Sequence, residues 1–231
     1  MPLKVIPRRD RKLNKLIKAA KPEEYRKGQD IFLHSENADT LFLVQRGHIR
    51  LTLPRTGKDV QRTVAIAGPG EIFGEEAITK DGSRRYTAVA GSACTVLPLS
   101  GAGVFKALRG SPTTLDVLLS SYDRDLAASR RMAGSSGSSS KARIADVVLD
   151  LAYRLGDDDG RRIRLGHWFT HQEIADLAGA HRSTVTTALN DWIYEGVLRQ
   201  YPRALTIAKP GTLRKAGSEA SRRRRRKKTS R

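Results

Sequence analysis

The 231-residue chain contains a single cysteine, Cys94, so that no disulfide and no cysteine-based zinc or iron–sulfur site can form within one chain. It lies in an apolar run, where we expect a small buried residue. No segment has the apolar length to cross a membrane, and the N-terminus lacks the apolar stretch of a signal peptide. We therefore expect a cytoplasmic protein with no membrane partner.

Catalytic groupings are missing as well, since no nucleophile–base set and no glycine-rich phosphate loop before a helix is found. A cupin-like metal enzyme is the alternative to consider, because Gly28, His34 and Glu36 copy part of a cupin motif. A metal site needs three or four converging ligands, however, and the partner histidine of His34 is absent. His48 has no partner at a comparable spacing, so we expect neither an enzyme nor a metal site.

Positive charge is in excess, with a formal net charge of +19, and it is concentrated at the two ends. Residues 1–27 hold ten Lys and Arg against three acids, and residues 214–231 hold ten against one. Basic ends favour polyanions, of which nucleic acid is the commonest. We expect residues 214–231 to be a disordered basic tail, with simple solubilisation as its alternative role. The run Arg222–Lys228 also suggests a nucleic-acid packaging protein, which would leave the patterns described below unexplained.

The N-terminal half predicts a β-rich domain after a short basic helix. Residues 1–24 are basic, with a helix over about Arg9–Ala20. Residues 25–110 contain short strand-like runs separated by Gly, Pro, Asn and Asp, the pattern of a sandwich or barrel. Residues 111–133 return to helical period, and Pro112 can occupy the first turn of that helix.

The helix over residues 111–133 carries an apolar stripe at heptad spacing, formed by Leu115, Leu119, Tyr122 and Leu126. Such a seam predicts pairing with a second copy of the same helix. The alternative is one helix packed on its own sheet, which Leu118, lying off the seam, would suit. We favour the homodimer.

The C-terminal part predicts a second domain beyond a linker. Residues 134–140, GSSGSSS, have the composition of a hinge, and residues 141–213 form the domain that follows it. A helix over residues 141–155 and a strand over residues 162–165 are expected first. Two further strands, over 196–200 and 203–207, would form a wing.

The stretch Thr170–Leu198 reads as two short helices joined by a turn at Gly179. Its second helix buries Val185, Leu189, Trp192 and Ile193 at helical period, which is typical of a helix-turn-helix. The opposite face starts with Arg182, which can contact guanine O6 and N7 with both ends of its guanidinium. The candidate DNA-binding residues are Thr170, His171, Gln172, His181, Arg182, Ser183, Thr184, Thr186 and Thr187.

These motifs in this order resemble the CRP/FNR family of bacterial transcription regulators. The run Gly68–Ala77 followed by Arg84–Ala88 is similar to the phosphate-binding cassette of that family, and Thr170–Thr186 resembles its helix-turn-helix. The resemblance implies an α+β protein with a cyclic-nucleotide-type, jelly-roll-like β-roll, a long dimerisation helix and a winged helix-turn-helix. It further implies a homodimer on double-stranded DNA with a pseudo-palindromic operator, and RNA polymerase as a partner. The cassette is most similar to stress-response regulators of the Thermus and Deinococcus lineage.

The cassette departs from the pattern of cyclic-nucleotide members, in which a serine or threonine follows the arginine. The effector-binding candidates are Gly74, Glu75, Glu76, Arg85 and Tyr86. Arg85 matches the phosphate-binding arginine and Glu75 the ribose-binding acid, but Tyr86 takes the place of the small hydroxyl. Glu76 adds a second carboxylate, which is unfavourable for an anionic ligand. Three readings stay open, namely cAMP, another small anion, or no effector, and we expect none to be required.

The recognition helix also departs from the family. Many members follow the first arginine with a glutamate and place a second arginine one turn later. Here Ser183 and Thr187 occupy those positions, so that sequence reading should be less stringent there.

Overall fold

The computed structural model describes residues 11–53, 62–79, 82–109, 111–133, 139–166, 169–202 and 204–216. The chain divides into two compact units, Met1–Ala127 and Ala128–Arg231. Across the described ranges, no helix combines the length and the apolar character that a membrane span requires.

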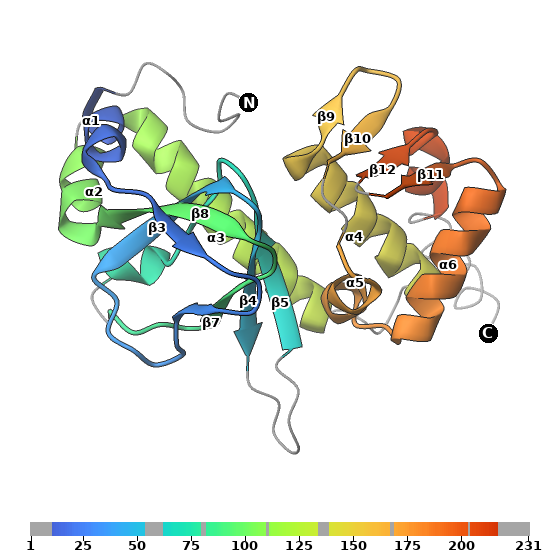
Figure 1. Cartoon of the computed structure of the whole chain (residues 1–231), viewed down its shortest axis with the longest axis horizontal. Coiled ribbons are helices and arrows are strands. Elements are labelled where there is room, and N and C mark those ends of the chain that lie inside the picture. The colour runs from blue at the N-terminus through green and yellow to red at the C-terminus, as the bar shows by residue number, and fades with distance from the viewer. Residues whose placement is uncertain are drawn as a thin grey trace, which may run out of the picture. The chain divides into compact units, whose positions relative to one another are not determined.

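The N-terminal unit is built on two antiparallel four-stranded sheets, in the orders β1-β8-β3-β6 and β2-β7-β4-β5 (Figure 1). This confirms the expected β-roll. Its strands are β1 (Glu23–Tyr25), β2 (Asp30–Phe32), β3 (Thr40–Arg46), β4 (Ile49–Leu53), β5 (Arg62–Ala67), β6 (Ile72–Phe73), β7 (Thr87–Ala90) and β8 (Cys94–Ser100).

Both faces of β3 are covered, which explains why its sequence is a continuous apolar run rather than an alternating one. On one face Phe42 meets Phe32 of the other sheet, with ring centroids 5.8 Å apart, and Phe73 packs on both rings. On the other face Leu41 and Leu43 belong to a cluster of buried residues that includes helical side chains. The β-roll therefore has an aromatic core between its sheets and an aliphatic core beneath its helices.

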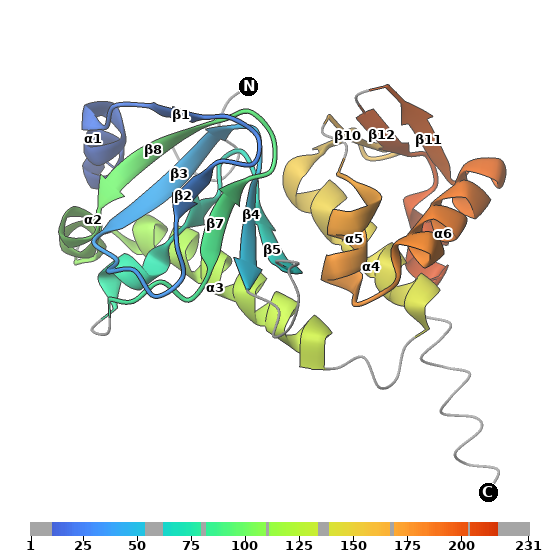
Figure 2. The ribbon, with the colours of Figure 1, turned by 60° about the horizontal axis from the view of Figure 1, so that its bottom comes forward.

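Three helices supply that aliphatic core, namely α1 (Arg11–Ala19), α2 (Gly101–Leu108) and α3 (Pro112–Ala133). Leu13 of α1 and Leu118 of α3 are buried in it beside Leu97 and Leu99 of β8. The helix expected over Arg9–Ala20 is thus found, and its lysines face solvent. Figure 2 shows α3 running along the β-roll.

The long helix α3 has two different faces within the N-terminal unit. Leu118 and Arg124 are buried, and the Arg124 guanidinium donates to the backbone oxygen of Ile72 at 3.0 Å. Leu115, Leu119 and Leu126 are 49%, 55% and 47% exposed. One face therefore packs on the sheet, as Leu118 suggested, while the leucines of the heptad stripe remain at the surface.

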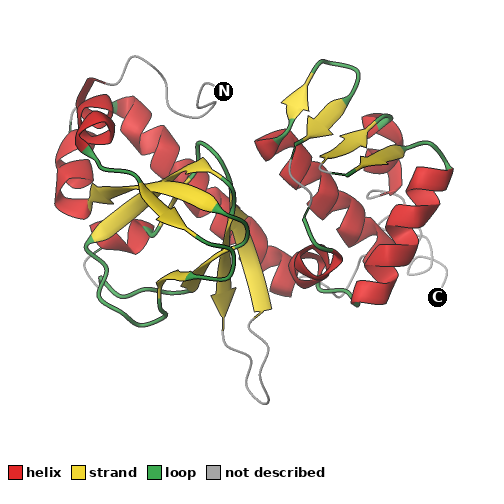
Figure 3. Cartoon of the chain, in the orientation of Figure 1, coloured by secondary structure: helices red, strands yellow, loops and turns green. Residues whose placement is uncertain are grey.

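The C-terminal unit combines the helices α4, α5 and α6 with one small antiparallel sheet in the order β11-β12-β10-β9 (Figure 3). The helix α4 packs against both α5 and α6, which pack on each other. The elements are α4 (Ser140–Leu155), β9 (Asp157–Asp158), β10 (Ile163–Leu165), α5 (His171–Ala178), α6 (Arg182–Tyr194), β11 (Leu198–Tyr201) and β12 (Ala204–Ile207). The wing predicted after the second helix is the β11–β12 hairpin.

Several expected boundaries need correction. Strand β1 begins before residue 25, because its backbone pairs with β8 from Glu23 onward. The hinge is shorter than residues 134–140, because Ser139 caps α4 by accepting from the Ala142 amide; residues 134–138 lie outside the described residues. Residues 210–216 are helical, with Leu213 buried and Arg214 donating to the Tyr153 hydroxyl at 2.7 Å. The first residues assigned to the tail, 214–216, are therefore part of the folded unit, and residues 217–231 are outside the described part.

Candidate DNA-binding and effector sites

The first helix of the helix-turn-helix, α5, begins with a complete capping box. The Thr170 hydroxyl oxygen accepts from the Glu173 amide at 3.1 Å, and the Glu173 carboxylate accepts from the Thr170 amide at 2.7 Å. The Thr170 hydroxyl also donates to that carboxylate at 2.9 Å. Its hydrogen is thus already used within the protein, and the donors left for a phosphate at this end are the first backbone amides of α5.

We expect Thr170→Ala to lower the free energy of unfolding by about 1 kcal/mol, because it removes a helix cap. The buried Glu173 carboxylate also loses one of its donors. Urea unfolding of the purified protein measures the change. Thr187→Ala is the control, since Thr187 is exposed on α6, and an exposed replacement changes stability by no more than about 0.5 kcal/mol. Equal losses in the two variants would contradict the structural role of the cap.

A polar contact joins the start of α5 to the recognition helix α6. His171 Nδ1 lies 2.8 Å from the Thr186 hydroxyl, which donates to the backbone oxygen of Arg182 at 3.1 Å. With the Thr186 hydrogen so placed, we assign a hydrogen to His171 Nδ1. Burial and, second, the Arg182 guanidinium lower the pKa of His171. The ring is therefore neutral at neutral pH and links the two helices as a hydrogen-bond donor.

The exposed face of α6 carries the predicted reading residues. His181, Arg182, Ser183 and Thr187 are exposed, and Thr184 and Thr186 are half-buried. Beneath them Val185, Leu189 and Trp192 are buried, as the helical period required, and Ile193 is half-buried. Gln172 of α5 bonds with Asp176 of the same helix at 2.8 Å. The structure thus brings together on α6 a cationic first residue and a row of small hydroxyls.

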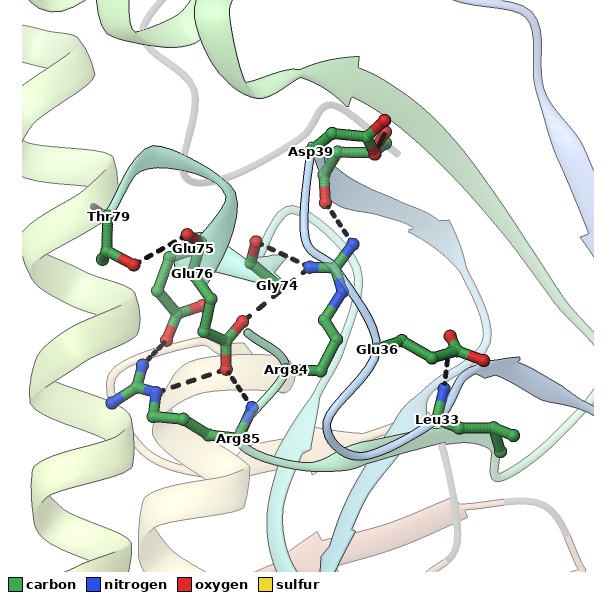
Figure 4. Close-up of polar contacts among 10 residues, drawn as sticks. Leu33, Glu36, Asp39, Gly74, Glu75, Glu76, Thr79, Arg84 and Arg85 are labelled. Carbon is green, nitrogen blue, oxygen red and sulfur yellow. Dashed lines mark hydrogen bonds and ion pairs between the residues drawn. The ribbon is translucent and has the colours of Figure 1, made fainter. Parts of the chain in front are cut away.

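In the β-roll, the two consecutive arginines of the cassette have opposite surroundings (Figure 4). The Arg84 side chain is buried over the Phe32 ring, 4.0 Å from its centroid, and donates to the backbone oxygens of Gly74 and Thr40. Gly74 adopts φ +78, and a Cβ there would lie 2.7 Å from the Arg84 guanidinium. Arg84 therefore fixes the cassette loop from below, a role that we did not infer from the sequence.

Arg85, the predicted ligand-binding arginine, is 44% exposed and already holds two carboxylates. Its guanidinium lies 3.1 Å from Glu75 and 3.2 Å from Glu76, and its amide donates to the same Glu76 oxygen at 3.1 Å. Both carboxylates are buried, because they sit on the short 3-10 turn Glu75–Ile78 that packs under the sheet. Figure 4 shows both pointing at Arg85.

Two tyrosines flank the same guanidinium. Arg85 lies 5.9 Å from the ring centroid of Tyr86 and 5.6 Å from that of Tyr122 on α3. Tyr86 thus offers a ring to the arginine where cyclic-nucleotide members offer a small hydroxyl. Tyr122, predicted only as a seam residue, also connects the cassette to α3.

The cupin-like grouping does not assemble a metal site. His34 Nδ1 pairs with the Ser35 hydroxyl at 2.7 Å, and Glu36 accepts from the Leu33 amide. Among the described residues, no three His, Cys, Asp or Glu side chains are placed to hold a metal ion.

Known proteins resemble the chain in both units. Residues 22–111 match the cyclic nucleotide-binding domain family, and residues 142–216 match the Crp-like helix-turn-helix domain family. The "Cyclic AMP receptor protein" of Thermus thermophilus is 31% identical over 192 residues, 82% of this chain and 84% of that protein. A "CRP-like cAMP-activated global transcriptional regulator" of Mycobacterium tuberculosis is 27% identical, covering 84% of this chain and 86% of the relative. The chain belongs to the CRP/FNR family.

Solved structures of this family share the fold. FixK2 from Bradyrhizobium japonicum superimposes with a TM-score of 0.72, covering 86% of this chain and 97% of FixK2, at 22% identity. A CRP-family regulator of Thermus thermophilus gives a TM-score of 0.61 at 24% identity, covering 85% and 97% of the two chains. This CRP/FNR protein is a DNA-binding transcription regulator and not an enzyme.

Proposed function

We propose that this CRP/FNR regulator binds a pseudo-palindromic operator as a homodimer and needs no effector to do so. The observation that carries the second part is the charge balance of the cassette. Arg85 is held by Glu75 and Glu76, with Arg84 beneath them. Two carboxylates and two guanidinium groups thus neutralise one another without a ligand.

An anionic ligand would have to take Arg85 from two buried carboxylates. If Arg85 turned to a ligand, Glu76 would still lie 3.8 Å from the Arg84 guanidinium. Glu75 would lose its ion pair with Arg85, in which the two charged groups are 3.1 Å apart. Drawing a guanidinium away from buried carboxylates that it already pairs with offsets part of what a phosphate would gain, although the exposed side of Arg85 keeps this cost below that of a fully buried pair. A ligand shifts a conformational equilibrium only by its difference in affinity for the two states. A phosphate group therefore gains little net free energy here, and control falls on the amount of protein.

The homodimer is supported by the exposed leucines of α3, which otherwise face water. A two-fold axis would present two α6 helices to successive major grooves, about one helical turn apart. Bound at a promoter in the cytoplasm, such a dimer would have RNA polymerase as its partner.

The test is an operator titration with and without cAMP, on protein checked by mass spectrometry for carried-over nucleotide. We expect operator binding by the nucleotide-free protein and less than a tenfold gain on adding cAMP, which corresponds to about 1.4 kcal/mol. Random DNA of the same length is the control ligand. A tenfold or greater gain that disappears in Arg85→Ala would overturn effector independence.

That outcome would establish the second candidate, a cAMP-dependent regulator. It is favoured by one feature of the site, the partial exposure of Arg85, and by the names of the Thermus and Mycobacterium relatives, which refer to cAMP. In that case Arg85 would bind the phosphate and Glu75 the ribose.

A further inference from the structure

The turn of the helix-turn-helix is held by a side chain from outside the motif. Arg143, in the first turns of α4, donates from Nε to the backbone oxygen of Ala178 at 2.8 Å and from Nη2 to that of Gly179 at 2.9 Å. Nη2 also reaches the Ser140 hydroxyl at 3.3 Å. One planar guanidinium therefore spans two consecutive carbonyls at the end of α5.

These carbonyls are the ones that the helix cannot satisfy by itself. Gly179 ends α5 in the left-handed conformation, so that its amide and that of Ala180 bond back to the last turn. The oxygens of Ala178 and Gly179 point out of the helix end, where the helix dipole is negative. A planar fork of charged donors fits both requirements, whereas the three donors of a lysine ammonium are not held in a geometry that matches two consecutive carbonyls.

The position of this turn decides where the recognition helix begins. His181 precedes α6 without a side-chain cap of its own, and Arg182 is its first residue. A displacement of Gly179 therefore passes through Ala180 and His181 directly to Arg182. Contacts to base edges demand placement within about 0.5 Å, so a small shift of the turn is enough to misplace them.

A second link from α4 is weaker. Lys141 pairs with Asp191 near the other end of α6 at 2.7 Å, and its ammonium lies 5.7 Å from the Trp192 ring centroid. Both charged side chains are nearly half exposed, and such pairs contribute only about 0–1 kcal/mol. The fork at the turn is therefore the stronger of these two polar links between the start of α4 and the helix-turn-helix.

We propose that Arg143 is a positioning residue for sequence reading, which it supports by fixing the α5–α6 turn and hence Arg182. It touches no base. Its removal should reduce the preference for operator over random DNA, because random binding depends on total charge and tolerates a displaced helix. This inference rests on the operator binding proposed above.

The experiment compares operator and random-DNA dissociation constants at one salt concentration for the full-length parent, Arg143→Lys and Arg143→Met. Arg143→Lys keeps the charge and loses the fork, while Arg143→Met keeps most of the stem. We expect the operator-to-random ratio to fall several-fold in Arg143→Lys and about tenfold or more in Arg143→Met. Arg154→Met is the matched control, because Arg154 lies on the same helix and pairs with Asp150 within it.

Each outcome decides the point. Failure of the parent to prefer its operator would refute the proposed function rather than the role of Arg143. A ratio within twofold of the parent in folded Arg143→Lys and Arg143→Met would refute the positioning role, as would equal losses on both DNAs. Thermal unfolding shows whether each variant is folded. If Arg143→Met is not folded, the operator-to-random ratio of Arg143→Lys alone tests the positioning role.

Discussion

Replacing Leu119 and Leu126 together by Asp is expected to convert the protein from a dimer to a monomer at micromolar concentration. Both side chains are about half exposed on α3. On dimerisation, each protomer would bury the exposed half of these two leucine side chains in the seam. At about 1 kcal/mol for each of the four side chains, the dimer loses roughly 4 kcal/mol, or about a thousandfold in its dissociation constant. Carboxylates facing one another in the seam add repulsion.

Sedimentation equilibrium measures the state directly, and operator binding should be lost with the dimer. The matched control is Leu33→Asp with Phe105→Asp, which places the same charges on leucine and phenylalanine side chains of the same unit that are 46% and 49% exposed. A parent protein that is monomeric at micromolar concentration would contradict the dimer. So would a dimer that survives the two α3 replacements.

Arg182→Ala is expected to cost about 1–3 kcal/mol of operator binding per half-site, the usual contribution of one bidentate contact to guanine. The guanidinium is exposed at the start of α6, and we expect its loss to relax the base preference at one position in each half-site. Binding selections with randomised half-sites, read by sequencing, reveal that position. Thr187→Ala, farther along the same exposed face, is the comparison and should change the preference less. Equal losses on operator and random DNA would mean that Arg182 contacts only a phosphate.

The architecture could be predicted from the sequence because its signals are local. The short apolar runs and turn residues of the β-roll, and the buried period of α6, each depend on neighbours a few positions apart. Strand β6 leaves almost no signal in the sequence, because only Ile72 and Phe73 pair with β3, between glycine-containing turns. Strand β9 was missed because Asp157 and Asp158 are poor strand formers, held by pairing with β10.

The helix α3 shows a different limit. Two interpretations of its apolar residues competed, and the structure supports the packing of Leu118 while leaving the stripe of leucines exposed. A helix with two apolar faces satisfies both patterns, and periodicity cannot say which partner covers the second. The homodimer and the stress-response role stay predictions.

For the site residues, contacts between positions far apart in the chain could not be predicted from the sequence. Arg84 and Arg143 each donate to carbonyls far along the chain, and in the sequence they resemble solvated surface. The sequence did contain one signal for the buried position of Arg84. Adjacent residues next to a strand point to opposite sides, so that only one of the two consecutive arginines can face a ligand. The spacing of Thr170 and Glu173 likewise predicts the capping box.

The division of α3 into a buried and an exposed face has a consequence for how promoter occupancy follows the concentration of the protein. Leu118 and Arg124 bind the helix to its own β-roll, so that the exposed leucines are presented before a second chain arrives. In the proposed dimer, the DNA-binding species then grows as the square of the monomer concentration while monomers are in excess. A modest rise in synthesis would give a steep rise in promoter occupancy, and dilution at cell division would reverse it. A threshold response of this kind requires no signalling molecule.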